Sequence, residues 1–255
     1  MKREAFSDAD VSRAVRLNSF LAQAGLGSRR RCEELIRAGA VRIGGEIVRE
    51  LATRVAADSR DVTVDGRPVL LQSKRYIAFH KPKGLLCSRA EHPGSRTIYQ
   101  ALPSELRSLF YVGRLDRDSE GLLFLTNDGD WAQRIAHPRA EVEKVYRVEL
   151  DRPLEDQARR RALAGVRDEG EMLKFEKVRA MPGRGGRGAV VEVVLREGKK
   201  REIRRLFRAL HHRVHSLKRL SIGGVELGDL PAGRWRELTT AELSRLACRS
   251  PSKAR

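Results

Sequence analysis

Residues 113–129 read GRLDRDSEGLLFLTNDG, which places a polar turn directly in front of an apolar run at 122–125. An apolar run of this length, bounded by turn residues, predicts a buried strand. Asp116 stands at the start of the polar turn, between Arg114 and Arg117. A carboxylate with cationic neighbours stays ionised and can serve as a nucleophile or a base. An Asp- and Gly-rich hairpin turn would show the same pattern, so spacing alone leaves both interpretations open.

The segments around this stretch alternate between strand and helix patterns. Apolar or alternating runs at 76–79, 145–150 and 189–195 predict further strands. Asp130 can cap a helix after the signature, and Thr239 can begin a last helix through a capping box. From residue 75 onward the chain therefore predicts a sheet with flanking helices.

A separate small module precedes this part of the chain. Apolar residues at helical spacing predict one helix that begins near Leu17 and ends at Gly25. Ser28 can cap a second helix that ends at Gly39. Short strand-like runs separated by glycine turns fill residues 41–71. The order helix, helix, small sheet predicts an independent domain.

The charge balance indicates a polyanionic partner. The 255 residues include 52 basic and 34 acidic ones, a net charge of +18. Residues 197–220 alone hold nine basic and two acidic residues, a net +7. Such a focus of positive charge favours nucleic acid binding.

The same basic segment carries a helix pattern that separates its arginines. Ile203, Leu206, Phe207 and Leu210 form an apolar stripe. At about 100° per residue, an arginine at 204 flanks that stripe, whereas one at 205 points nearly opposite. We therefore expect Arg204 to be half-buried beside a carboxylate, and the remaining cations to contact phosphate. These are Lys199, Lys200, Arg201, Arg205 and Arg208.

Several classes of protein are disfavoured by the sequence. It contains no apolar run of the ~20 residues that a membrane helix requires, and no signal peptide is visible. Three scattered cysteines suggest idle thiols in a reducing cytoplasm. The three histidines between 211 and 215 lack acidic or cysteine partners, so no metal site is expected. The glycine-rich residues 183–188 lack the ending of a phosphate loop and predict a hairpin tip.

The first module resembles the S4-type RNA-binding domain over roughly residues 14–70. The residues that carry the resemblance are GSRRR at 27–31, Glu34, Ile36, GAVRI at 39–43 and Gly45. Basic residues at a helix start and on the next strand suit phosphate binding. The predicted RNA contacts of this module are Arg29, Arg30, Arg31, Arg37 and Arg42, and Arg114 is added from the signature. A plain basic surface would look similar.

The signature itself is similar to that of the ribosomal pseudouridine synthases of the RsuA and RluB type. The resemblance covers about residues 14–245. It includes KPKG at 81–84, EKVY at 143–146, EGKKREIRRL at 197–206, LKRLSIG at 217–223, LGDL at 227–230 and GRWR at 233–236. One departure is Glu202, where many relatives carry glutamine, which could alter a polar contact to RNA.

The resemblance implies an enzyme that isomerises uridine to pseudouridine in RNA, without metal or cofactor. It implies that Asp116 is the catalytic aspartate, that Tyr146 packs on the base and aids removal of the C5 proton, and that Arg204 pairs with the aspartate. A structural tyrosine in a core strand would look identical to Tyr146. The target base must leave its stack to reach the site. Sequence does not choose between attack of the aspartate on the sugar and formation of a glycal.

The fold class expected is α+β, with an S4-type domain at 14–72 and a synthase domain at 73–248. The synthase domain is expected to be built on a mixed, mainly antiparallel sheet, with polar tails at 1–13 and 249–255. The partner expected is ribosomal RNA, free or in an assembly intermediate, with 23S rRNA favoured and 16S rRNA the alternative. A cytoplasmic monomer is expected. A non-catalytic ribosome-assembly factor and a metal-dependent nuclease using Asp116, Asp118 and Asp128 are the competing classes.

Overall fold

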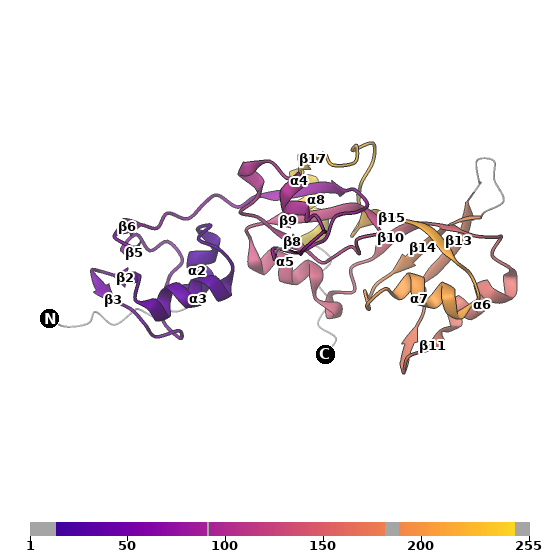
Figure 1. Cartoon of the computed structure of the whole chain (residues 1–255), viewed down its shortest axis with the longest axis horizontal. Coiled ribbons are helices and arrows are strands. Elements are labelled where there is room, and N and C mark those ends of the chain that lie inside the picture. The colour runs from indigo at the N-terminus through magenta and orange to yellow at the C-terminus, as the bar shows by residue number, and fades with distance from the viewer. Residues whose placement is uncertain (1–13, 91, 182–188, 248–255) are drawn as a thin grey trace. The chain divides into compact units, whose positions relative to one another are not determined.

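The computed structural model describes residues 14–90, 92–181 and 189–247 (Figure 1). The chain divides into two compact units, one of residues 1–75 with 127–129 and one of the remaining residues. This division lies three residues after the predicted domain boundary. The predicted tails, the predicted hairpin tip at 183–188 and Cys248 lie outside the described residues.

The smaller unit begins with two helices, α2 (Leu17–Gln23) and α3 (Arg29–Ala38). The Ser28 hydroxyl accepts a hydrogen bond from the Arg31 amide at 3.2 Å, so serine caps α3 as predicted. Gly39 ends the helix at φ 76°, a left-handed conformation that favours glycine. Among the described residues, four short strands form a sheet in the order β3-β2-β5-β6, and β1 pairs with β4. Their bounds are β1 (Ala14–Arg16), β2 (Val41–Ile43), β3 (Glu46–Ile47), β4 (Arg54–Ala56), β5 (Val62–Val64) and β6 (Arg67–Pro68).

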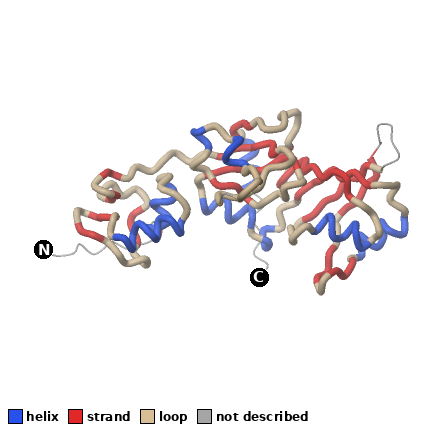
Figure 2. The backbone as a smooth tube through the Cα atoms, viewed as in Figure 1, coloured by secondary structure: helices blue, strands red, loops and turns tan. Residues whose placement is uncertain are grey.

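The larger unit is built on one sheet, which comprises nine strands in the described part of the chain. Its main path runs β13-β14-β10-β15-β9-β7-β17, with β16 added to β15 and β8 added to β9. Every pairing is antiparallel except that of β15 with β9. The strands are β7 (Tyr76–Lys81), β8 (Phe110–Val112), β9 (Glu120–Thr126), β10 (Lys144–Leu150), β13 (Lys177–Met181), β14 (Val190–Leu195), β15 (Val214–Ile222), β16 (Val225–Glu226) and β17 (Trp235–Glu237). Figure 2 shows these strands in red.

The apolar run of β9 is buried on both faces of the sheet. Leu122 and Phe124 pack with α5 (Gly129–Ala136) and α8 (Thr240–Ala247), whereas Leu123 and Leu125 pack with α4 (Ile98–Ala101). Alternating side chains point to opposite faces, so a continuous apolar run is what a doubly covered strand requires. Asp130 lies in the first turn of α5 rather than at its cap, because the helix begins one residue earlier.

The other half of the sheet is covered by α6 (Asp156–Ala164) and α7 (Glu202–Ala209). Phe207 of α7 lies 5.2 Å from Phe175 between ring centres, within a core that includes residues of β10, β14 and β15. A two-stranded hairpin, β11 (Val166–Asp168) and β12 (Glu171–Leu173), follows α6. The predicted α+β class and the mixed, mainly antiparallel sheet are both confirmed.

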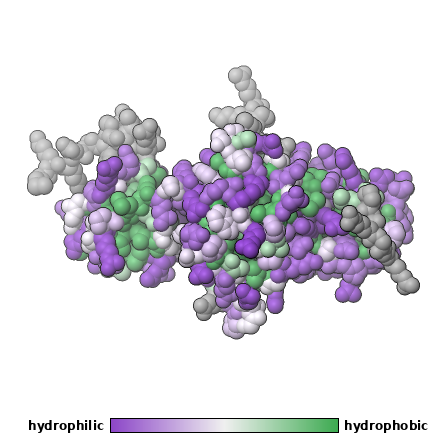
Figure 3. All heavy atoms as spheres, turned by 90° about the horizontal axis from the view of Figure 1, so that it is seen from above, coloured by the Kyte–Doolittle hydropathy of each residue, from purple (hydrophilic) through white to green (hydrophobic). Residues whose placement is uncertain are grey.

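Figure 3 shows hydrophilic side chains over most of one face, with hydrophobic ones in smaller patches. No helix in the described ranges has both the length and the apolar character needed to cross a membrane.

Candidate active site

The signature turn lies between β8 and β9, and Lys81 binds its backbone carbonyls. This lysine side chain is fully buried at the end of β7. Its Nζ donates hydrogen bonds to the carbonyl oxygens of Asp116 at 3.0 Å, Ser119 at 2.8 Å and Pro82 at 3.1 Å. Burial lowers the pKa of Lys81, because the charged form loses its hydration. Lys81 therefore fixes the backbone of the turn and does not bind the Asp116 carboxylate.

A second buried cation, Arg219 of β15, contacts the backbone at both ends of the same turn. Its Nε donates to the Leu122 carbonyl at 2.7 Å, and one terminal nitrogen lies 3.4 Å from the Arg114 carbonyl. The same nitrogen lies 3.4 Å from the Tyr146 hydroxyl. The guanidinium carbon stands 5.9 Å from the centre of the Tyr146 ring. Arg219 thus links the turn to the predicted base-binding residue.

The Asp116 carboxylate opens into a cavity of about 280 Å³. Its walls also include Tyr146, Leu217 and residues of the loop that leads into α7. The side chain of Asp116 is 38% exposed, so a ligand in the cavity could reach it. Arg201 is the cation nearest to it in the structure, with 3.6 Å between Nη1 and Oδ2.

Tyr146 forms another wall of this cavity, from the strand position that the sequence predicted. In β10 the side chains of Tyr146, Val148 and Leu150 are buried, and those of Arg147 and Glu149 are exposed. This alternation confirms the predicted face. The structure brings Tyr146 of β10 and Asp116 of the signature turn to one cavity.

Arg204 reaches the signature turn but contacts Asp118 and not Asp116. Its Nη2 lies 3.1 Å from both the carboxylate and the backbone carbonyl of Asp118, and Nη1 donates to the Val214 carbonyl at 3.1 Å. Its side chain is 14% exposed, so the predicted partial burial is confirmed. The predicted direct pair with Asp116 is wrong in this structure, because Asp118 lies nearer to the guanidinium.

Two arginines set the ionisation of Asp118. Partial burial alone would raise the pKa of this carboxyl, but hydrogen bonding from Arg201 and the charge of Arg204 hold it below its usual value. Asp118 therefore stays ionised and fastens the turn to the start of α7.

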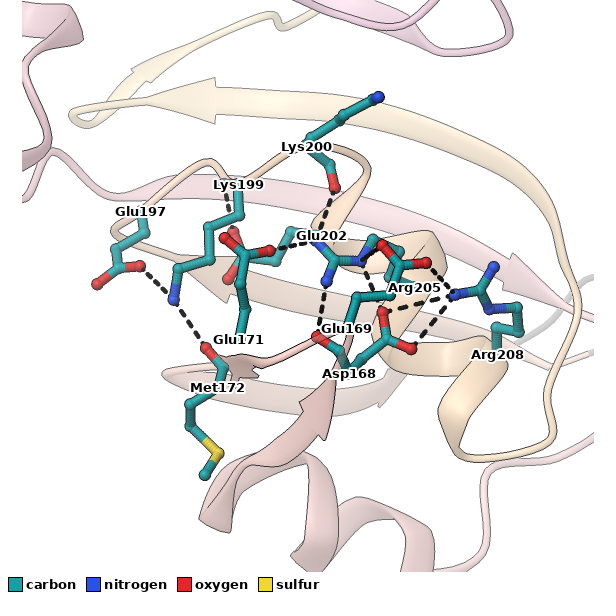
Figure 4. Close-up of polar contacts among 10 residues, drawn as sticks. All are labelled: Asp168, Glu169, Glu171, Met172, Glu197, Lys199, Lys200, Glu202, Arg205 and Arg208. Atoms are coloured by element: carbon teal, nitrogen blue, oxygen red, sulfur yellow. Dashed lines mark hydrogen bonds and ion pairs between the residues drawn. The ribbon is translucent and has the colours of Figure 1, made fainter.

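Arg205 does not have the exposed position that helix periodicity predicted. It is 9% exposed, because the β11–β12 hairpin covers the face of α7 opposite the apolar stripe. Its guanidinium donates to the carboxylates of Asp168 and Glu171 and to the Asp168 carbonyl (Figure 4). Internal partners occupy the side chain, so this position does not support the predicted phosphate contact of Arg205.

Most of the other predicted phosphate contacts around α7 also have internal partners. Lys199 pairs with Glu197 at 2.8 Å and donates to the Met172 carbonyl at 2.7 Å, and Arg208 lies 3.3 Å from Asp168 (Figure 4). The Lys200 side chain is exposed and makes no polar contact with any described residue. The carboxylates of the β11–β12 hairpin therefore offset part of the +7 charge, so fewer cations remain open to RNA.

Glu202, the residue that departs from the family pattern, is turned inward. It is 5% exposed, and its carboxylate accepts a hydrogen bond from the Lys199 amide at 3.0 Å. Burial raises the pKa of Glu202. Glu202 holds the turn that precedes α7 and also lines the 280 Å³ cavity, so an altered polar contact to RNA stays a prediction.

The five predicted arginines of the smaller unit lie in the first and last turns of α3 and on the strand after it, and all five are exposed. Arg31 pairs with Glu34 at 2.8 Å, Arg37 lies 3.7 Å from Glu33, and Arg42 donates to the Gly45 carbonyl at 2.9 Å. Exposed ion pairs of this kind contribute little and exchange readily for a phosphate. Arg29 and Arg30 stand in the first turn of α3, where backbone amides also favour an anion.

The structure does not gather metal ligands in the part of the chain that it describes. No group of three or more His, Cys, Asp or Glu side chains there could hold a metal ion. His212 is buried after the end of α7, and its Nδ1 lies 3.6 Å from the Asp151 carboxylate. This position indicates a structural role for His212.

Comparisons with known proteins identify the relatives of this chain. The family model of RNA pseudouridylate synthases matches residues 75–209, and the S4 domain matches residues 15–61. The chain is 40% identical to an uncharacterized RNA pseudouridine synthase of Aquifex aeolicus, over 91% of this chain and 93% of that protein. It is 37% identical to the ribosomal large subunit pseudouridine synthase B of Vibrio cholerae, over 91% of this chain and 74% of that protein. The crystal structure of a pseudouridylate synthase is 31% identical and superposes with a TM-score of 0.64, covering 91% of this chain and 99% of that one.

The chain therefore belongs to the RNA pseudouridine synthase family and carries an N-terminal S4 domain.

The Arg205 network gives a prediction on stability. Hydrogen bonding from Arg205 lowers the pKa of Asp168 below the usual value of 3.8. The ion pair of Arg205 with Asp168 therefore stabilises the fold at pH values above 3.8. This contribution is lost as the pH falls through the lower pKa that Asp168 has in the folded state. Asp168→Asn should thus lower the urea midpoint at pH 7, and its difference from the native chain should shrink below about pH 4.

Tryptophan fluorescence can follow this unfolding, because Trp131 and Trp235 both lie in the larger unit. Glu169→Gln is the matched control, since Glu169 is 69% exposed and its loss should change the midpoint little. A midpoint difference for Asp168→Asn that stays constant down to pH 3 would contradict the pairing.

Proposed function

We propose that this enzyme isomerises a specific uridine of 23S ribosomal RNA to pseudouridine, and that Asp116 is its catalytic residue. The observation that carries the proposal is a carboxylate and a tyrosine meeting in one 280 Å³ cavity beside two arginines. Support for the large-subunit RNA comes from the name of the Vibrio cholerae relative. The sequence of the signature turn and the N-terminal module favour the same branch.

The reaction is an isomerisation, so no atoms are gained or lost. The N1–C1′ bond breaks, the base turns, a C5–C1′ bond forms, the C5 proton leaves and N1 takes up a proton. The uridine must be flipped into the cavity, with its sugar toward Asp116 and its base against the Tyr146 ring. Both chemical routes, addition of the carboxylate to the sugar and formation of a glycal, require an ionised group beside the ribose.

Each remaining polar residue has a separate task in this proposal. Tyr146 lines the cavity, and its task is to pack on the base and aid removal of the C5 proton. Arg201 supplies positive charge next to Asp116, and Arg204 acts as a positioning residue by holding Asp118. Lys81 and Arg219 keep the turn rigid, because each binds its backbone carbonyls.

The RNA strand is proposed to lie along the exposed cations of each unit. In the smaller unit these are Arg29, Arg30, Arg31, Arg37 and Arg42. In the larger unit they are Arg114 and Lys200, which line the 280 Å³ cavity. Phosphate contacts of this kind position the strand and make binding weaken with salt.

The proposal is tested with the purified enzyme and transcripts of 23S and 16S rRNA that carry tritium at uridine C5. We expect release of about one tritium equivalent per 23S transcript at saturation and none from 16S. Release from 16S alone would move the target to the small subunit. Binding without release from either transcript would favour a non-catalytic assembly factor.

A further inference from the structure

A second cavity, of about 140 Å³, also has Tyr146 in its wall. It is bounded by the end of β8, by Ile135 and Ala136 at the end of α5, and by Lys144 and Arg219 of the sheet. Tyr146 and Arg114 line both cavities, so the two spaces adjoin. None of the tasks described above uses this second space.

The walls of the second cavity carry more positive than negative charge. They hold four cationic side chains and one carboxylate, Glu197, which is paired with Lys199. One of the four cations, Arg196, is paired with Glu143 at 3.1 Å, so three cations remain. The Lys144 ammonium donates to the carbonyls of Val142 and Arg196, at 2.9 and 3.0 Å, and has no ion pair within the described residues. Burial, and then the charge of Arg219, lower the pKa of Lys144 to about 8. An anion in the cavity would relieve this repulsion.

Arg219 offers a hydrogen bond that the protein does not use. The residue is 3% exposed, and its Nη2 has no hydrogen-bond partner among the described residues. A buried charged donor without an acceptor is costly, and a ligand oxygen at that point removes the cost. Arg219 lines the second cavity and not the first, so this cavity is the space that adjoins the residue with the unused donor.

We propose that the second cavity binds a phosphodiester group of the RNA strand, next to the nucleotide held against Tyr146. The inference rests on the proposed function and names a contact that the function does not require. The cavity exceeds the ~30 Å³ that one water occupies in the liquid severalfold, so it can hold a phosphate group. A phosphodiester carries one negative charge and two free oxygens, which match the unpaired charge and the unused donor. Since a phosphate is one sugar away from each base, a strand whose base lies in the first cavity brings phosphates to the adjoining space.

The test places a negative charge at the rim of the cavity without touching the buried cations. Ala136 is exposed and lines the cavity at the last residue of α5, so Ala136→Glu brings a carboxylate to its mouth. Ala136→Gln has nearly the same size and no charge, and it sets the steric baseline. Gln133→Glu adds the same charge one turn earlier on α5, at an exposed position outside the cavity lining, and controls for long-range electrostatics.

The probe is the 23S transcript, and both binding across a salt series and tritium release are measured. We expect Ala136→Glu to bind about tenfold more weakly than Ala136→Gln at low salt, with a salt slope smaller by about 0.7–0.9, the value for one lost phosphate contact. Gln133→Glu should bind like the native enzyme. Equal affinities and slopes for the two Ala136 variants, or an equal loss in Gln133→Glu, would overturn the inference.

Failure of the proposed function can be told apart from failure of this inference. If the native enzyme releases no tritium from any transcript, the proposed function fails, and the binding comparison still decides the phosphate contact. If the native enzyme turns over and Ala136→Glu matches Ala136→Gln in both measurements, the function stands and the second cavity has no phosphate.

Discussion

Asp116→Asn is expected to lower tritium release from the 23S transcript by about 10³-fold or more, while RNA binding stays close to native. The amide has the size of the carboxylate but cannot act as an ionised group beside the ribose. The turn should keep its shape, because Lys81 holds the backbone carbonyl of Asp116 rather than its side chain. Single-turnover release reports the chemical step, and filter binding with the same transcript reports the affinity.

Asp118→Asn is the matched control for this experiment. It makes the same chemical change two residues further on, at a carboxylate that pairs with Arg201 and Arg204. Its loss should loosen the turn and reduce the rate, yet leave turnover measurable. Native-like release by Asp116→Asn would remove this carboxylate from the reaction, and abolition of release by Asp118→Asn alone would transfer the catalytic role to Asp118.

Local sequence patterns predicted the elements of the fold well where those patterns have a direct physical cause. Ser28 and Gly39 bound α3 because capping is decided by neighbouring backbone groups. The alternation in β10 predicted the inward face of Tyr146 because the pleat has a period of two. The order of strands in the sheet is not a local property, and the sequence patterns did not predict it.

Helix periodicity failed at Arg205 for a specific reason. A hydrophobic stripe identifies the face of a helix that packs on its own core, but it does not say what covers the opposite face. In this fold the β11–β12 hairpin supplies Asp168 and Glu171 to that face, from more than 30 residues earlier in the chain. The same long-range contact explains why counting charges within residues 197–220 overstated the cations available to RNA.

Sequence analysis also gave no role to Lys81 and Arg219, the two buried cations that shape the site. A signal was present, since Lys81 ends a strand that begins with an apolar run and Arg219 stands next to Leu220 in β15, and a buried charge must find partners. The partners are backbone carbonyls of the signature turn, and backbone acceptors leave no trace in sequence.

Gly121→Ala should destabilise the larger unit strongly, because this residue is where β9 meets β15 in the sheet's parallel pairing. Gly121 has a φ of 114°, and an added Cβ would lie near the Arg219 backbone oxygen and nitrogen, at distances that no real contact allows. Positive φ costs a non-glycine residue about 1–2 kcal/mol and overpacking about 1–3 kcal/mol, so we expect a loss of roughly 2–5 kcal/mol. Urea unfolding followed by tryptophan fluorescence measures it in the unit that holds both tryptophans.

Gly84→Ala separates the two contributions. Gly84 has a φ of 89°, but an added Cβ there meets no atom within 4 Å, so only the backbone cost of about 1–2 kcal/mol remains. A larger loss in Gly121→Ala than in Gly84→Ala would show that close approach to Arg219 requires glycine at 121. Because Arg219 also contacts the Tyr146 hydroxyl, Gly121→Ala should reduce tritium release even in molecules that remain folded. The contrary outcome is an equal unfolding midpoint and native-like tritium release in both alanine variants. It would mean that β15 can move away from the signature turn without loss of stability or activity, and that Arg219 is not needed to hold the turn.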